Sequence, residues 1–164
     1  MVGLVGVSLV AADRKDLPPT ERRFGTDFVL TVKTLDGWKT PLGRATLVDA
    51  RGEVKWEREL PHHHGPRRVL VTQSGQVLLV DEWINVLSRY ALTLIAPSGV
   101  TVAQYSGEHL ISALGVPRAA IRLHARLGAW MTVEPRMDGD SVFFEAGGRR
   151  LVLRLADGQL SARD

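Results

Sequence analysis

Residues Leu92–Tyr105 read LTLIAPSGVTVAQY, two runs rich in β-branched residues on either side of a Pro-Ser-Gly turn. Gly99 can take the positive φ that a tight turn requires, and the serine before it can hydrogen-bond to the turn backbone. The stretch therefore predicts a β-hairpin. Two further stretches have the same form, Ala45–Trp56 around Gly52 and Leu151–Ser161 around Gly158.

Each of these closing hairpins follows another predicted hairpin. The leading segments are Phe24–Val32, Val69–Val80 and, for the third, Ala129–Val133 followed by Met137–Phe144. The closing glycines lie 47 and 59 residues apart. Periods of about 40–50 residues with about four strands each are typical of propeller blades. The sequence predicts an all-β fold of about three antiparallel hairpin-pair units, an incomplete or small propeller-like array.

The longer second interval contains a predicted helical insertion at about 107–127. Ser106 and Glu108 are suited to cap a short helix that Gly115 and Pro117 end. Pro117 also suits the first turn of a second helix that extends to about Leu127. The segments 35–43 and 83–88 are expected to be loops within units.

Length and composition predict one β domain over residues 1–164. The chain is 45% hydrophobic and 24% charged, which is enough apolar surface to form a core. It has no cysteine, which excludes disulfides and thiolate metal sites. No apolar run reaches the roughly 18–20 residues of a membrane span. Residues 1–12, MVGLVGVSLVAA, suit either a first strand or a signal-peptide remnant without its basic start.

The basic charge is modest and dispersed. The formal charge is +3 and the isoelectric point about 9.7. Arginine and lysine occur in separate pairs, which are 14–15, 22–23, 67–68 and 149–150. Such pairs are typical of a solvated surface, so nucleic acid is not the expected partner.

A resemblance follows from motifs in the first two units. Leu47-Val-Asp49, Gly52, Trp56, Glu59-Leu60 and Gly65-Pro66, followed by residues 74–83 (SGQVLLVDEW), resemble uncharacterised bacterial proteins with quinoprotein-like or WD40-like propeller repeats. Proteins of that group are often exported, which implies a periplasmic or secreted location. The resemblance implies no catalytic residue. Because about four to eight blades close a ring, the N-terminal segment could add strands, the array could stay open, or two chains could complete it.

Three consecutive histidines, His62–His64, are one candidate site. Imidazoles bind transition metals, but a site needs three or four ligands that converge. In an extended chain only His62 and His64 share a face. We therefore predict no metal site and interpret the segment as an exposed polar loop.

Asp81-Glu82-Trp83 is a second candidate. Two carboxylates beside an indole suit sugar binding or glycoside hydrolysis. Neighbouring strand residues point to opposite faces, however. In the alternative interpretation, Asp81 fixes the strand end through backbone hydrogen bonds and Trp83 packs between blades.

Arg118, Arg122 and Arg126 recur every four residues and should share a helix face. Such a stripe could bind phosphate groups. The alternative is an amphipathic surface helix whose Ile121, Leu123 and Leu127 contact the sheet.

The sequence has no Walker, dinucleotide-binding, zinc-protease or nucleophile-elbow motif. We therefore expect a non-catalytic binding or scaffolding module without a cofactor, whose partner is another protein or a second copy of the chain. The alternatives are a hydrolase acting on a sugar or lactone through Asp81 or Glu82, and an anion or nucleic-acid binder through the arginine stripe.

Overall fold

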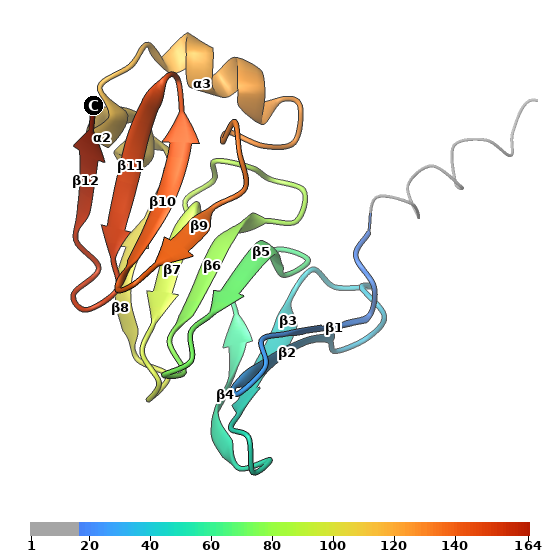
Figure 1. Ribbon diagram of the computed structural model, residues 1–164. Helices are drawn as coiled ribbons and strands as arrows, with labels where there is room; N and C mark the ends of the chain where they lie inside the picture. The colour runs from blue at the N-terminus through green and yellow to red at the C-terminus, as the bar shows by residue number, and fades with distance from the viewer. Residues whose placement is uncertain (1–16) are drawn as a thin grey trace, which may run out of the picture.

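The computed structural model describes residues 17–164, which form three four-stranded antiparallel sheets and two short helices (Figure 1). The expectation for residues 1–12 lies outside the described residues. The first sheet comprises β1 (Glu21–Phe24), β2 (Val29–Thr34), β3 (Gly43–Val48) and β4 (Val54–Leu60). The second comprises β5 (Pro66–Val71), β6 (Val77–Glu82), β7 (Leu92–Ile95) and β8 (Thr101–Tyr105). The third comprises β9 (Arg136–Asp138), β10 (Ser141–Ala146), β11 (Arg149–Arg154) and β12 (Leu160–Arg163).

Each sheet is a meander whose strands pair in sequence order, so the prediction of three hairpin-pair units is confirmed. Over the described residues the three sheets form a stack and do not close into a ring. Short turns join the strands at one end of the stack, which we call the turn end. The longer connections, including the links between sheets, lie at the opposite end, which we call the connector end, together with the short turn between β10 and β11.

The second sheet is the middle layer and is buried on both faces. All six residues of β6 are buried, as the uninterrupted apolar run VLLV would suggest. Val77 and Leu79 join the core shared with the first sheet. Leu78 and Val80 join the core shared with the third sheet and the helices. Because side chains alternate along a strand, one strand contributes to both cores.

The two outer faces of the stack are mainly polar, and each has one apolar cross-strand pair, Val29–Val48 on the first sheet and Phe143–Val152 on the third. On the first sheet Lys33 lies opposite Arg44 in the register, and Arg44 forms an ion pair with Glu57 at 3.3 Å. On the third sheet Glu145 lies opposite Arg150. Polar outer faces are what terminal units of a stacked array require, because they end the array without an apolar surface in water.

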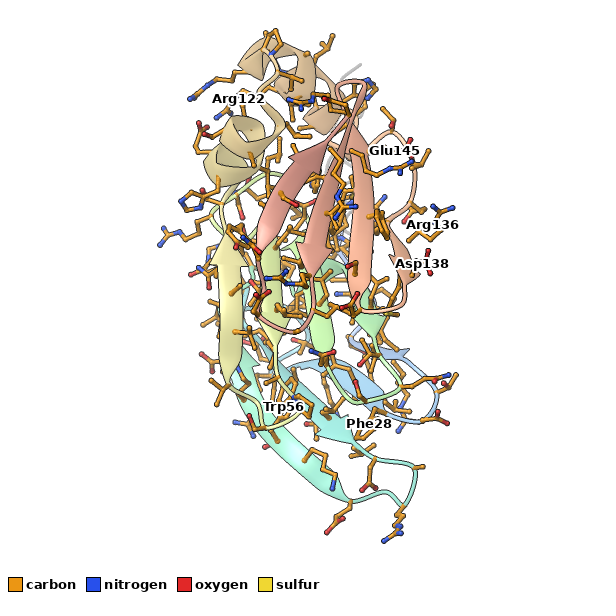
Figure 2. The ribbon with its side chains drawn as sticks, turned by 60° about the vertical axis from the view of Figure 1, so that its left-hand side comes forward. Phe28, Trp56, Arg122, Arg136, Asp138 and Glu145 are labelled. Atoms are coloured by element: carbon orange, nitrogen blue, oxygen red, sulfur yellow. The ribbon has the colours of Figure 1, made fainter. Side chains whose placement is uncertain are left out.

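Aromatic side chains fix one sheet against the next at the turn end. Trp56 of β4 packs on the turn glycine Gly99, where an added Cβ would lie 2.9 Å from the indole (Figure 2). Tyr105 of β8 donates its hydroxyl proton to the carbonyl oxygen of the turn glycine Gly158 at 2.6 Å. The closing strand of one sheet therefore contacts the closing turn of the next in both interfaces.

The predicted helical insertion is confirmed as α2 (Gly107–Leu114) and α3 (Arg118–Ala125). Ser106 is the N-cap of α2: its hydroxyl accepts from the backbone N–H of His109, and Gly115 ends the helix with a φ of 64°. Ile121 is fully buried, as expected. The expected sheet contact of Leu123 and Leu127 is wrong, since these side chains are 64% and 84% exposed. No helix within residues 17–164 is long and apolar enough to span a membrane.

The expected strand at Ala129–Val133 is also wrong. The first strand of the third sheet is β9, which begins only at Arg136. Trp130 is fully buried, and its ring stacks on Phe144 with centroids 5.6 Å apart. Residues 129–133 follow an irregular path that places the indole of Trp130 in the interior.

Candidate functional site

Strained backbone collects at the connector end. Among the described residues, the non-glycine positions with positive φ are Trp38, His64, Asp81 and Leu87, with φ between 56° and 65°. All four lie in the connections at this end or at the strand terminus beside them. A left-handed backbone away from glycine costs on the order of 1–3 kcal/mol, and such strain concentrates at functional sites. The connector end is therefore one candidate region for a functional site.

His62 is not part of an exposed loop, which corrects that interpretation. Its side chain is fully buried and packs against Tyr90, with the ring centroids 5.1 Å apart and the ring planes tilted by 37°. Neither ring nitrogen has a hydrogen-bond partner among residues 17–164. Burial lowers the pKa of His62 to about 4, so the ring is neutral at pH 7.

His64 has different surroundings from His62. Its ring lies 5.6 Å from that of Trp38, and burial lowers its pKa. Within residues 17–164 no group of three or more histidine, aspartate or glutamate side chains is placed to hold a metal ion. The two histidines fix the link between the first and second sheets.

Asp81 and Glu82 each fasten a different segment. Asp81 is fully buried and accepts hydrogen bonds from the backbone N–H of Leu87 and from the indole N–H of Trp130, both at 2.9 Å. Burial raises the pKa of Asp81 to about 7. Glu82 is also buried and accepts from the backbone N–H of His63 at 2.9 Å. Through these contacts both side chains hold neighbouring segments of the chain in place.

The arginine stripe of α3 is partly neutralised by α2. Glu108 accepts from Arg118 at 3.1 Å and from Arg122 at 2.6 Å. Arg126 follows the last turn of α3 and is exposed. One carboxylate shared by two guanidinium groups leaves a weak excess of positive charge on this helix, which carries Arg122 on the outside of the molecule (Figure 2).

A second group of arginines, which the sequence presented as dispersed pairs, is brought together by the fold. Arg22 and Arg23 lie in β1, Arg67 and Arg68 in β5, and Arg136 in β9. These are the first strands of the three sheets, and they lie along one edge of the stack (Figure 1). We call this the first-strand edge. The signal in the sequence was the recurrence of Arg-Arg at the start of the first strand in two units.

Trp83 lies beneath this group, where the first and second sheets meet. The guanidinium carbon of Arg22 is 4.7 Å from the indole centroid, and that of Arg67 is 6.0 Å away. Arg22 donates to the carbonyl of Pro66 at 2.7 Å, and Arg67 donates to the carbonyl of Trp83 at 2.6 Å. Burial lowers the pKa of Arg22 to about 10, so it remains charged at pH 7. Two cations are thus held at fixed positions by one indole and two carbonyls.

A groove of about 360 Å³ opens on the same edge. Arg68 donates from Nε and Nη2 to the two carboxylate oxygens of Glu134, at 2.7 and 2.8 Å. The third nitrogen of Arg68, Nη1, is buried without a hydrogen-bond partner in the described part of the chain, as is Nε of Arg22. We call this hollow the first-strand groove; its lining residues are Phe24, Arg67, Arg68, Val69, Leu70, Glu134 and Pro135.

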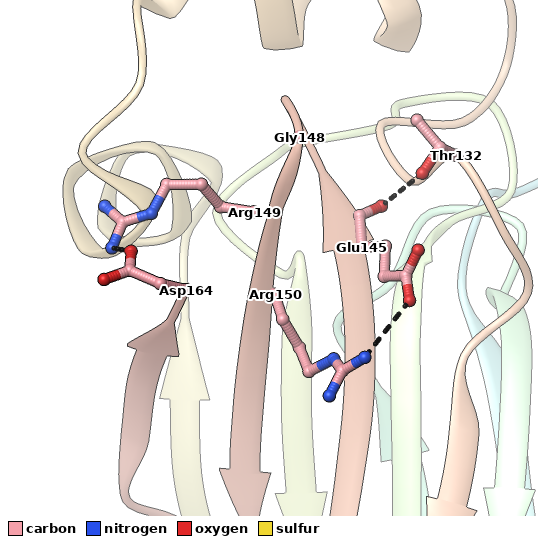
Figure 3. Close-up of a pocket in the computed structure, with 6 residues that line it drawn as sticks. All are labelled: Thr132, Glu145, Gly148, Arg149, Arg150 and Asp164. Carbon is pink, nitrogen blue, oxygen red and sulfur yellow. Dashed lines mark hydrogen bonds and ion pairs between the residues drawn. The ribbon is translucent and has the colours of Figure 1, made fainter.

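A second hollow, of about 250 Å³, lies beside β10 and β11 (Figure 3). Arg149 pairs with Asp164 at 2.8 Å, and Arg150 with Glu145 at 3.8 Å. Thr132 donates to the backbone carbonyl of Glu145 at 3.1 Å. Each arginine in this hollow has its own carboxylate, whereas the first-strand groove has two arginines and one carboxylate. The first-strand groove is therefore the better candidate for a charged ligand.

Comparison with known proteins adds no assignment to this geometry. No protein-family model and no curated protein sequence matches the chain. The propeller-like character accordingly rests on the three stacked four-stranded sheets.

Proposed function

We propose that this chain is a non-catalytic binding module that recognises another protein through the first-strand groove. The observation that carries the proposal is the fixed pair Arg67 and Arg68, with Arg22 and Trp83 beside them, on an open edge of a rigid stack. A groove with preset donors binds a partner without ordering loops first, which reduces the entropic cost of association.

The repeat architecture supports the same role. Three meander sheets in sequence order are compatible with membership among the proteins with quinoprotein-like or WD40-like propeller repeats. Stacked sheets of this kind present edges and loops for recognition and need no reactive group. An exported protein of the periplasm or cell exterior would use such a surface to hold a partner.

The other two functions receive less support from the geometry. A glycoside hydrolase needs two carboxylates on either side of a substrate, whereas Asp81 and Glu82 hold Trp130 and the connector backbone. An anion site on α3 would have to displace Glu108 from both Arg118 and Arg122.

The proposal is tested by photo-cross-linking from two positions. A benzophenone amino acid replaces Val69, which lines the groove, or Val54, which is 58% exposed on β4 at the opposite edge. The expected result is one cross-linked protein from position 69 and none from position 54. The protein so identified is then purified, and its affinity should fall when Arg68 is replaced by alanine. Cross-linking that is equal from both positions, or an affinity that Arg68→Ala leaves unchanged, would contradict the proposal.

A further inference from the structure

We propose that the first-strand groove binds an acidic, extended peptide segment of the partner, and that Glu134 occupies the guanidinium fork of Arg68 until a ligand carboxylate replaces it. This inference rests on the proposed protein-binding function and adds the chemical class of the segment that is bound.

The Arg68–Glu134 contact shows how the groove receives a carboxylate. The two donor nitrogens and two acceptor oxygens form the parallel pair of hydrogen bonds that arginine and carboxylate prefer, at 2.7 and 2.8 Å. Arg68 is fixed in β5 and its side chain is only 23% exposed. Glu134 belongs to the irregular segment before β9, and its side chain is 74% exposed. The arginine is thus the preset partner and the glutamate the replaceable one.

Replacement of Glu134 would cost little. Glu134 is 74% exposed and is well solvated when it leaves, whereas Arg68 is only 23% exposed and needs another acceptor in its place. An incoming carboxylate restores the two hydrogen bonds and leaves Glu134 in water. Nη1 of Arg68 is buried without a hydrogen-bond partner among residues 17–164, so a ligand acceptor that reaches it would pair a donor that Glu134 leaves unpaired. Buried donors of this kind are costly until an acceptor reaches them.

The rest of the groove favours a peptide over a phosphate or nucleic acid. Its remaining lining is mostly apolar, from Phe24, Val69, Leu70 and Pro135. An extended peptide places successive side chains on opposite faces. Acidic residues at alternate positions can therefore meet the arginines while apolar residues between them contact the apolar wall. Inorganic phosphate and polyphosphate offer nothing to that wall, and single-stranded DNA, whose bases could stack on Phe24, is compared directly in the test.

The inference is tested by fluorescence anisotropy with two labelled eight-residue peptides. One alternates glutamate with valine, and in the other glutamine replaces every glutamate. The glutamate peptide should bind the wild-type chain, and its affinity should fall as salt is raised. The glutamine peptide should bind at least about tenfold more weakly, because charge-assisted bonds to arginine are replaced by neutral ones.

Substitutions of the two ends of the ion pair should have opposite effects. Glu134→Gln removes the internal competitor and should tighten binding of the glutamate peptide about threefold, within the range of an exposed ion pair. Arg68→Gln should weaken binding of the glutamate peptide about tenfold. Arg68→Lys should weaken it less, because lysine keeps the charge but cannot form the two parallel hydrogen bonds of arginine. Glu57→Gln is the matched control: it breaks the exposed Arg44–Glu57 pair on the outer face of the first sheet and should change nothing. Thermal unfolding of each variant verifies that it is folded.

Weaker or unchanged binding by Glu134→Gln would overturn the replacement of Glu134. Equal binding of the two peptides, or preferential binding of polyphosphate or single-stranded DNA, would overturn the acidic-peptide assignment. Binding of neither peptide would also overturn it. In each of these cases a groove-dependent protein cross-link from position 69 would leave the protein-binding function standing.

Discussion

Trp130 donates its indole proton to Oδ2 of Asp81 at 2.9 Å, and both side chains are fully buried. The bond joins the end of β6 in the second sheet to the segment that precedes β9 in the third, across 49 residues of sequence. The backbone of Asp81 is left-handed, with a φ of 56°. A buried carboxyl group at the edge of the larger core thus anchors the segment that leads into the third sheet.

The titration of Asp81 should make this region more stable in acid. Burial raises the pKa of Asp81 to about 7 in the folded protein, whereas an unfolded aspartate titrates near pH 4. The folded state therefore binds more protons between about pH 4 and pH 7, and the free energy of unfolding contributed by this group falls as pH rises through that window. Asparagine tolerates the left-handed backbone, so Asp81→Asn removes the titration with little backbone strain.

The measurement is urea denaturation of wild type and Asp81→Asn at several pH values. The free energy of unfolding of the variant minus that of wild type should increase from pH 4 to pH 7, by on the order of 3 kcal/mol. The lost hydrogen-bond acceptor lowers the free energy of unfolding of the variant by an amount that does not change with pH, so it does not affect the expected increase. A difference that stays constant with pH would show that Asp81 titrates normally.

His62 should act in the opposite direction over nearly the same range. Burial lowers the pKa of His62 to about 4 in the folded protein, and an unfolded histidine titrates near pH 6.5. The unfolded state then binds more protons between these values, so the stability from His62 is lost as pH falls from about 6.5 to 4. His62→Phe keeps a ring against Tyr90 and removes two buried nitrogens that lack partners among residues 17–164.

We expect His62→Phe to gain stability relative to wild type as pH falls from 6.5 to 4, by on the order of 3 kcal/mol, in the same urea series. Because His62 and Asp81 oppose each other, wild type should have a flatter pH profile than either variant. A His62→Phe profile parallel to that of wild type would contradict the burial of a neutral imidazole.

The packing of Trp56 on Gly99 predicts unequal effects of two glycine substitutions in equivalent turns. Gly52 and Gly99 have φ values of 79° and 88°. An added Cβ at Gly52 meets nothing within 4 Å, whereas at Gly99 it lies 2.9 Å from the indole of Trp56. Gly52→Ala should therefore cost only the backbone strain, about 1 kcal/mol. Gly99→Ala adds a steric conflict between sheets of about 1–3 kcal/mol. If thermal or urea unfolding showed that the two variants lose the same amount of stability, Trp56 would not fix the interface between the first and second sheets.

Much of the fold could be predicted because its signals are local. Gly52, Gly99 and Gly158 mark their turns in the sequence, and Ser106 and Gly115 mark the ends of α2. These signals depend on a residue and its near neighbours, so one sequence suffices. Where a distant partner decides the structure, prediction failed. Residues 129–133 have strand-forming residues, but the interior takes up Trp130.

The candidate site was harder to predict for the same reason. His62 has a polar side chain in a polar run, and its burial involves contact with Tyr90, which lies 28 residues further along the chain. The pairs Arg22-Arg23 and Arg67-Arg68 were visible in the sequence as separate charges. Their convergence depends on how two sheets stack and on Trp83 between them. Glu134 lies 66 residues from Arg68, and no local pattern relates the two.

The polar outer faces predict that the chain does not complete a ring with a second copy. A second copy on the outer face of the first sheet would cover Lys33, Arg44 and Glu57, which are exposed or form exposed ion pairs. Removing such charges from water costs more than their mutual attraction returns unless new partners are supplied. Native mass spectrometry at low micromolar concentration should therefore give a single chain of 18.0 kDa. The double variant Lys33→Val, Arg44→Val should associate as concentration rises, because it converts this face to an apolar one. A stable wild-type dimer would contradict the prediction, and a dimer dispersed by high salt would place these charges within its interface.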